Sequence, residues 1–286
     1  MSKVDLDYLH LLQLELAKEV KRICKKYDIR YFLVDGSALG AVNLNGFLPW
    51  DDDLDIGMYW PDYQKFLKAC EAELPPRYKM KDFTTDDSFG CSFGQLIDTQ
   101  IELVQENNQN AGDVKGVFID IHPFSNCSDS KLLRKLEYYR FKIYKLCLLQ
   151  RREYIGGGSK VVVVLKLLNR LYSEDGLKKR IMKMRNRSAG KYALKIHGRY
   201  PEDYVVIENL EKLSQADFAG EEFPIQPDAQ RMLDSVYGPF DINKNEVNRH
   251  GITALKTRGG GYIVIDIIVL FEAPTDCGCE RLVRAA

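Results

Sequence analysis

The chain has 286 residues, of which 45% are hydrophobic and 29% charged, enough for one large domain with a buried core, with room for an insertion. Its 41 Lys and Arg residues balance its 41 Asp and Glu residues, so no overall positive charge attracts nucleic acid, and we expect no nucleic-acid partner. The seven cysteines are scattered and form no CxxC pair, which argues against a disulfide framework and a zinc site and predicts a cytoplasmic protein. The first segment is polar and the apolar runs are short, so we expect neither a signal peptide nor a membrane span.

The first quarter of the chain predicts helices and strands in alternation. Apolar residues at steps of three and four predict an amphipathic helix over 6–27, and a short buried strand follows over 31–34. Next comes a turn at Asp35-Gly36-Ser37, where Ser37 is placed to cap a short helix. The acidic segment near residue 53 is predicted as a strand, and residues 62–74 as a second amphipathic helix that ends before two prolines.

Further along, the sequence predicts strands and then helices. Residues 92–98 and 101–104 predict a hairpin, and 116–121 predict a buried strand that carries Asp120 and ends at His122-Pro123. Residues 131–152 and 161–186 are predicted helical and strongly basic, and a helix over 229–236 closes at Gly238. We therefore expect a catalytic core over 1–127, a basic helical insertion over 128–200, a C-terminal part of the catalytic domain over 201–250 and an atypical tail over 251–286.

The acidic run is the most informative feature of the chain, with carboxylates at Asp51, Asp52, Asp53 and Asp55. In a strand, alternate side chains point to one side, so Asp53 and Asp55 are expected to face together, while Asp52 is expected to point away. Paired carboxylates suit Mg²⁺ or Mn²⁺, particularly when phosphates complete the shell. An acidic surface turn is the alternative interpretation of such a run taken alone.

Two other segments favour the metal interpretation. Gly36 allows the backbone to approach a phosphate closely, and the helix that begins near Ser37 directs N–H groups at an anion. Asp120 lies on a buried strand and supplies a third carboxylate. Together these segments have the layout of a two-metal phosphoryl-transfer centre, in which Asp53, Asp55 and Asp120 are the catalytic residues.

Residues 34–42, 46–58 and 117–123 resemble the LicD family of phosphotransferases, and the similarity resumes at 223–225, Tyr237-Gly238 and Arg249-His250. That family includes bacterial phosphocholine transferases and, more distantly, fukutin-type ribitol-phosphate transferases, and it belongs to the nucleotidyltransferase superfamily. The resemblance implies an α/β (α+β) fold, a nucleotidyltransferase-like mixed sheet flanked by helices, with a helical insertion.

The resemblance also implies an activity, the metal-dependent transfer of a phospho-alcohol from a CDP-alcohol donor such as CDP-choline to a hydroxyl of a cell-surface glycan, with release of CMP. The acceptor classes it suggests are lipopolysaccharide, teichoic acid and capsule, in free or lipid-linked form. By residue, it implies that Asp53, Asp55 and Asp120 bind Mg²⁺ or Mn²⁺ and that Gly36 and Ser37 contact phosphate. Asp51 is a further acid near the substrate. The alternatives are a nucleotidyltransferase that moves NMP from an NTP, or an idle nucleotide- or glycan-binding protein.

For four further residues or groups the sequence leaves alternatives open. Trp50 packs against the acidic segment or stacks on the donor head group. His122 makes a structural hydrogen bond or relays a proton. Arg249 and His250 contact donor phosphates if the resemblance to the LicD family extends to their roles. The basic helices between 131 and 187 have ordinary solvated faces or lie on an anionic membrane, which would place the protein peripherally at its inner face.

Overall fold

The computed structural model describes residues 3–82, 86, 89, 92–105, 116–151, 160–195, 203–242, 252–257 and 262–264. Across these residues, no helix combines the length and the apolar character needed to cross a membrane. The helices are α1 (Lys3–Tyr27), α2 (Asp35–Leu44), α3 (Trp60–Glu73), α4 (Lys131–Arg151), α5 (Lys160–Leu168), α6 (Glu174–Arg185) and α7 (Ala229–Tyr237), with a short 3₁₀ helix at Ile207–Glu211. The strands are β1 (Phe32–Leu33), β2 (Asp55–Tyr59), β3 (Tyr78–Lys81), β4 (Gly94–Asp98), β5 (Ile101–Gln105), β6 (Val117–Cys127), β7 (Tyr192–Lys195), β8 (Tyr204–Val206), β9 (Ser214–Phe218), β10 (Glu221–Ile225), β11 (Ile252–Thr257) and β12 (Tyr262–Val264).

The central sheet is mixed, and its centre is the pair β2 and β6. Its strand order is β1-β2-β6-β4-β3, with β7 and β8 added beside the second half of β6. Strands β2 and β6 are parallel, and the other neighbours in this sheet are antiparallel. The predicted mixed sheet flanked by helices is confirmed.

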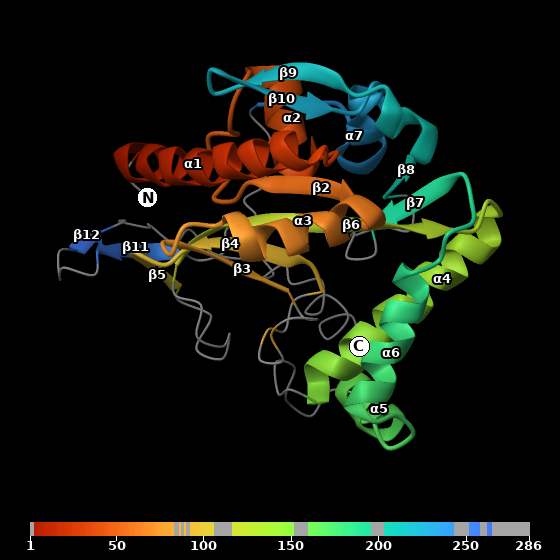
Figure 1. Ribbon diagram of the computed structural model, residues 1–286. Coiled ribbons are helices and arrows are strands. Elements are labelled where there is room, and N and C mark those ends of the chain that lie inside the picture. Colours follow the sequence, from red (N-terminus) through yellow and green to blue (C-terminus); the bar gives the residue numbers. More distant parts are fainter. Residues whose placement is uncertain are drawn as a thin grey trace.

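The two faces of the central strands have different environments. One face carries apolar side chains, including Leu54, Ile56 and Ile119, which join the main core with side chains from α1 and α3. The alternate residues point to the opposite face, and these include Asp55, Asp120 and His122. In Figure 1, α1, α2, α7 and the β9–β10 hairpin lie over one side of the sheet, while α4, α5 and α6 extend from its end.

Three predicted elements differ from the structure. Strands β4 and β5 do not pair as a hairpin, because β4 pairs with β3 and β6 whereas β5 pairs with β11. Strand β6 continues through His122-Pro123 to Cys127, since a proline removes one backbone donor without preventing an extended backbone. The second basic region forms two helices, α5 and α6, and Ser173 caps α6 by accepting a hydrogen bond from the Gly176 N–H at 3.1 Å.

The start of α2 also differs from the prediction. The helix begins at Asp35, with Val34 as its N-terminal flanking residue and no side-chain cap. Ser37 therefore lies inside the first turn, where its hydroxyl has another role, described below. Helices α4 to α6 fall within residues 128–200, and the expected domain boundaries at 127, 200 and 250 stay predictions.

Candidate active site

The acidic run is held in place by the first helix. The Gln13 side chain of α1 donates a hydrogen bond to the Asp52 carbonyl at 2.8 Å, and Gln13 is buried. One turn earlier, His10 Nε2 lies 2.7 Å from the Asp51 carbonyl oxygen. Residues 51–54 have an irregular conformation, and β2 begins only at Asp55. The predicted single strand face shared by Asp53 and Asp55 is therefore wrong in detail, because Asp53 precedes the strand.

Three carboxylates nevertheless converge, as the sequence predicts. Asp55 and Asp120 are direct neighbours in the parallel register of β2 and β6. Asp53, Asp55 and Asp120 each offer an oxygen atom, and these atoms lie within 4.8 Å of one another. Gln95 of β4 is the cross-strand partner of Asp120 and donates a hydrogen bond to its Oδ1 at 2.9 Å, which fixes the direction of that carboxylate.

The electrostatics of this cluster suit a bound cation. Asp55 and Asp120 are 7% and 4% exposed, so water solvates their charges weakly. Burial, followed by the charges of Asp53 and Asp55, raises the pKa of Asp51 well above its ordinary value. Such crowding of like charges is relieved by a divalent ion, and hard oxygen ligands are those that Mg²⁺ and Mn²⁺ prefer. The residues present therefore fit such an ion.

Asp52 does not point away from this group. It is 3% exposed, and its carboxylate belongs to a second close cluster with those of Asp51 and Asp53. The expectation that Asp52 points away is wrong, because residues 51–54 do not alternate as a strand would. Trp50 is half-buried and packs against the main core, which agrees with the packing interpretation of this residue.

Gly36 and Ser37 lie directly against the acidic cluster. A Cβ atom at Gly36 would lie 2.1 Å from Asp51 Oδ2, so only glycine leaves room for that carboxylate. The Ser37 hydroxyl accepts a hydrogen bond from the Asp55 backbone N–H at 2.8 Å. Because a hydroxyl can accept and donate at once, its own proton stays available for another acceptor. The contacts of both residues with phosphate stay predictions.

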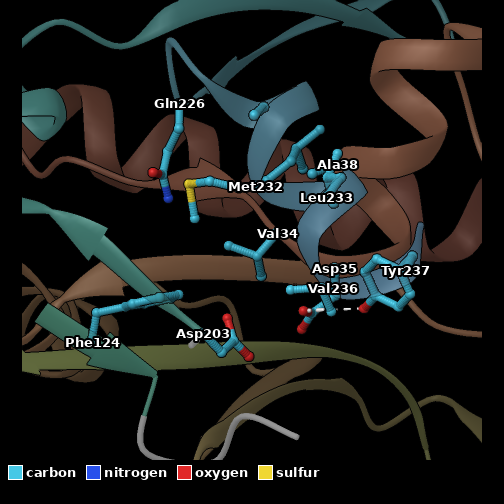
Figure 2. A pocket seen from close by; sticks show the side chains of 12 residues that line it. Val34, Asp35, Ala38, Phe124, Asp203, Gln226, Met232, Leu233, Val236 and Tyr237 are labelled. Carbon is cyan, nitrogen blue, oxygen red and sulfur yellow. Dashed lines mark hydrogen bonds between the residues drawn. The ribbon is translucent and has the colours of Figure 1, made fainter. Parts of the chain in front are cut away.

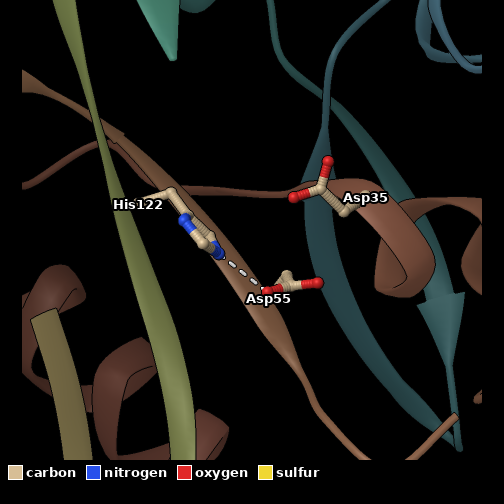
Figure 3. Close-up of side chains that lie close together, drawn as sticks. All are labelled: Asp35, Asp55 and His122. Atoms are coloured by element: carbon tan, nitrogen blue, oxygen red, sulfur yellow. Dashed lines mark hydrogen bonds and ion pairs between the residues drawn. The ribbon is translucent and has the colours of Figure 1, made fainter. Parts of the chain in front are cut away.

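His122 contributes a neighbour that the sequence left undecided. It lies two residues beyond Asp120 on β6, and its Nε2 is 2.8 Å from Asp55 Oδ1. Figure 3 shows this pair with Asp35 beside it, and the three side chains form another close cluster. Burial and the positive charge of Lys195 lower the pKa of His122, so the ring is neutral near pH 7. A neutral ring protonated on Nε2 donates this hydrogen bond and orients Asp55.

An ion-pair network centred on the buried Lys195 adjoins the cluster, and the sequence analysis did not predict it. Lys195 of β7 is 5% exposed and pairs with Asp35 and, at 3.2 Å, with Asp203. Burial opposes the lysine charge, but the two carboxylates outweigh it and raise the pKa of Lys195. Tyr237 of α7 donates a hydrogen bond to Asp35 at 3.4 Å. The network thus ties β7 and α7 to the start of α2.

Asp35 has a backbone conformation that supports a functional site at this position. Its φ is +48°, in the left-handed region that residues other than glycine adopt rarely. Such strain persists where surrounding contacts hold the residue in place, and it concentrates at functional sites. Figure 2 shows Asp35, Asp203 and Tyr237 around a small cavity, whose volume is about 40 Å³. Of these three residues, only Asp35 belongs to a segment that the sequence analysis singled out, the turn Asp35-Gly36-Ser37.

Two predicted site residues, Arg249 and His250, lie outside the described residues. The others divide into two groups. Asp53, Asp55 and Asp120 converge, with Asp51, Gly36 and Ser37 in contact with this cluster or its backbone. Trp50 lies beside the run, on the core.

Part of the chain is similar to known proteins. Residues 28–149 match the model of the LicD/FKTN/FKRP nucleotidyltransferase domain, a range that includes all three converging carboxylates. The lipopolysaccharide cholinephosphotransferase LicD of Haemophilus influenzae is 28% identical over 122 residues, which are 42% of this chain and 45% of that protein. An uncharacterized protein of Rickettsia typhi is 42% identical over 67 residues, 23% of this chain and 22% of the relative. An uncharacterized protein of Rickettsia prowazekii is 42% identical over 48 residues, 17% of this chain and 18% of the relative. The chain thus spans less than half the length of each of these relatives.

Proposed function

We propose that this protein is a metal-dependent phosphotransferase, because residues 28–149 match the model of the LicD/FKTN/FKRP nucleotidyltransferase domain. It moves a phospho-alcohol, such as phosphocholine, from a CDP-activated donor to a hydroxyl of a glycan and releases CMP. The observation that carries the proposal is the convergence of Asp53, Asp55 and Asp120 within 4.8 Å at the parallel pair of strands.

In this proposal Asp53, Asp55 and Asp120 hold Mg²⁺ or Mn²⁺. When bound, a divalent ion neutralises the charge that develops on the phosphate oxygens. The N–H groups at the start of α2 and the Ser37 hydroxyl bind the donor phosphates, since helix N-termini favour anions. The acceptor hydroxyl attacks the phosphorus beside the alcohol, its proton passes to Asp120 or to water, and CMP leaves. Gln95 and His122 keep Asp120 and Asp55 in the required orientation.

Product analysis tests the proposed reaction. We expect CMP when the full chain is incubated with CDP-choline, CDP-ribitol or CDP-glycerol and Mg²⁺ or Mn²⁺, and none when EDTA is added. Detection of CMP by chromatography is the measurement, and CDP-glucose serves as a donor whose head group is a sugar. Pyrophosphate from CTP or ATP, without CMP from any CDP-alcohol, would instead support a nucleotidyltransferase. Absence of every product with a glycan acceptor present would favour an idle binding protein.

We also propose that helices α4 and α5 contact the membrane surface, where a lipid-linked glycan acceptor would lie. On α4, Leu132, Leu136 and Tyr139 recur at steps of four and three and are 69%, 56% and 46% exposed. Lys131 and Lys135 flank this stripe and are exposed. Exposed apolar side chains beside basic ones are typical of helices that lie in the membrane interface. On α5, Val163, Val164 and Leu167 are more than half exposed.

Vesicle co-sedimentation tests this contact. We expect the protein to bind phosphatidylglycerol vesicles at low salt and Leu136→Ser to weaken binding about tenfold, since burying a leucine is worth about 1.5–3 kcal/mol. Leu11→Ser is the matched control, because Leu11 is 60% exposed on α1, away from the stripe. Equal binding of the two variants would contradict the contact, whatever the enzymatic activity.

A further inference from the structure

A second cavity lies where α4 and α6 meet the end of β6. Its volume is about 390 Å³, and Ser125, Asn126 and Cys127 line it together with Leu194 of β7. Arg140, Phe141 and Tyr144 line it from α4, Arg180, Lys183 and Met184 from α6, and Arg187 from the segment that follows α6. A volume in this range suits a small ligand. None of the residues placed in the phosphotransfer site lines it.

The basic residues reach this cavity because of their spacing. Arg140 and Tyr144 are four residues apart on α4, and Arg180, Lys183 and Arg187 follow at steps of three and four on α6 and its end. Residues at these steps lie on one face of a helix. The basic side chains of α4 and α6 therefore line the same cavity, which they border from its solvent-exposed side.

The described residues that line the cavity do not balance its charge. Four basic residues (Arg140, Arg180, Lys183 and Arg187) and one acidic residue (Glu137) line it, so four less one leaves a net charge of +3. Arg187 pairs with Glu137. Within the described part of the chain, Arg140, Arg180 and Lys183 form no ion pair with a carboxylate.

The wall of the cavity contains a polar group without a partner. Ser125 is 1% exposed, and its Oγ has no hydrogen-bond partner among the described residues. A buried hydroxyl without a hydrogen bond lowers stability, and a ligand oxygen that reached Ser125 would satisfy it. Its neighbour Asn126 is already used, since it accepts a hydrogen bond from the Tyr59 hydroxyl at 2.6 Å.

We propose that this cavity binds a ligand that carries a phosphate or diphosphate group, held by Arg140, Arg180 and Lys183 with the Ser125 hydroxyl. Guanidinium and ammonium groups are the usual partners of phosphate in proteins, and a net charge of +3 suits a ligand with more than one negative charge. Phe141 and Met184 provide an apolar wall beside the charged one. The site is independent of the proposed phosphotransfer.

Two probes distinguish the sources of such a phosphate. Inorganic pyrophosphate represents a soluble ligand, and vesicles of phosphatidylcholine with phosphatidic acid present the same phosphate chemistry on a lipid. Binding to the full chain is measured by calorimetry for pyrophosphate and by co-sedimentation for vesicles. EDTA is present, so that no divalent ion neutralises Asp53 and Asp55, and their charges repel an anion from the proposed phosphotransfer site. Phosphatidylcholine vesicles without phosphatidic acid give the background.

The double variant Arg140→Gln/Lys183→Gln tests the site. We expect it to weaken binding of at least one probe about tenfold or more, because each charge-assisted hydrogen bond is worth about 1.4 kcal/mol or more. Lys68→Gln/Lys179→Gln is the matched control, because it removes the same charge from exposed positions of α3 and α6 outside the cavity. Ser125→Ala is expected to weaken binding several-fold without lowering the melting temperature, since it removes an unpartnered group.

Pyrophosphate binding that depends on the cavity residues supports a soluble ligand, and binding only to phosphatidic acid vesicles with the same dependence supports a lipid head group. If neither probe binds the wild-type protein, or if the two double variants weaken binding equally, the proposed site is wrong.

Discussion

Asp53→Asn and Asp55→Asn are each expected to lower CMP release from the best CDP-alcohol by about 10³-fold or more, because loss of a metal ligand removes several kcal/mol of charge stabilisation in the transition state. The fold should survive. Each change removes one negative charge from a group of three carboxylates within 4.8 Å, so the melting temperature of the metal-free variants should equal or exceed that of the wild type.

Asp98→Asn is the matched control for these variants. Asp98 is a carboxylate of the same sheet, 2% exposed on β4, and accepts a hydrogen bond from Arg77 Nε at 2.9 Å. It lies outside the converging carboxylates, so its substitution should lower the melting temperature and leave kcat unchanged. Near wild-type CMP release by Asp53→Asn or Asp55→Asn with Mg²⁺ would refute the assigned site.

Lys195→Met is expected to produce the largest loss of stability, about 3–5 kcal/mol in the free energy of unfolding near pH 8, because breaking a buried ion pair leaves uncompensated charge. Two partly buried carboxylates, Asp35 and Asp203, lose their cation together. Urea denaturation followed by circular dichroism measures the effect. Because the network also holds the first residue of α2, CMP release should fall in the variant even under conditions where it is fully folded.

The pH dependence of this loss follows from the pKa shifts. Burial, opposed by the charge of Lys195, raises the pKa of Asp203 to about 6 even with the lysine present. In the wild type, burial works against the Asp35 charge, but the charge of Lys195 and the hydrogen bonds from Lys195 and Tyr237 outweigh it and hold the Asp35 pKa below its ordinary value. At pH values above the ordinary pKa of an aspartate, the charged Asp35 therefore stabilises the fold, and this stabilisation is lost as the pH falls through the lowered pKa of Asp35.

Without Lys195, burial raises the pKa of both carboxylates above their unfolded values. Folding then takes up protons, so stability falls as the pH rises. The difference between wild type and Lys195→Met should therefore be smaller at pH 5 than at pH 8. Lys212→Met is the matched control, because Lys212 pairs with Glu208 on the exposed surface and should show no measurable change. An equal loss at both pH values would contradict the assigned network.

Much of the candidate site is local in sequence and was predictable. The Asp-rich segment, the Gly36-Ser37 pair and the strand around Asp120 each combine a charge or a turn with apolar neighbours, and such patterns depend only on short-range chemistry. Helix α1 and helix α3 were predictable for the same reason, since apolar residues recur with the helical period. The similarity to the LicD family lies in these same segments.

Other features depend on how distant segments pair, which no local pattern contains. Strand β4 pairs with β3 and β6 and not with β5, because the pairing of each strand depends on contacts across the whole sheet. Lys195 and Asp203 follow Asp35 by about 160 residues, and neither has a motif of its own. The same holds for the second cavity, whose basic walls come from two separate helices.

The sequence by itself determined the carboxylates, the glycine that leaves room for one of them, and the similarity of residues 28–149 to the LicD family, because these require only residue types at fixed spacing. Only the tertiary structure decided which oxygen atoms meet. It placed Asp55 opposite Asp120 through the parallel register of β2 and β6, and placed Asp53 beside them from an irregular segment held by α1. Register and packing fix distances between side chains, and the proposed chemistry at this acidic run depends on those distances.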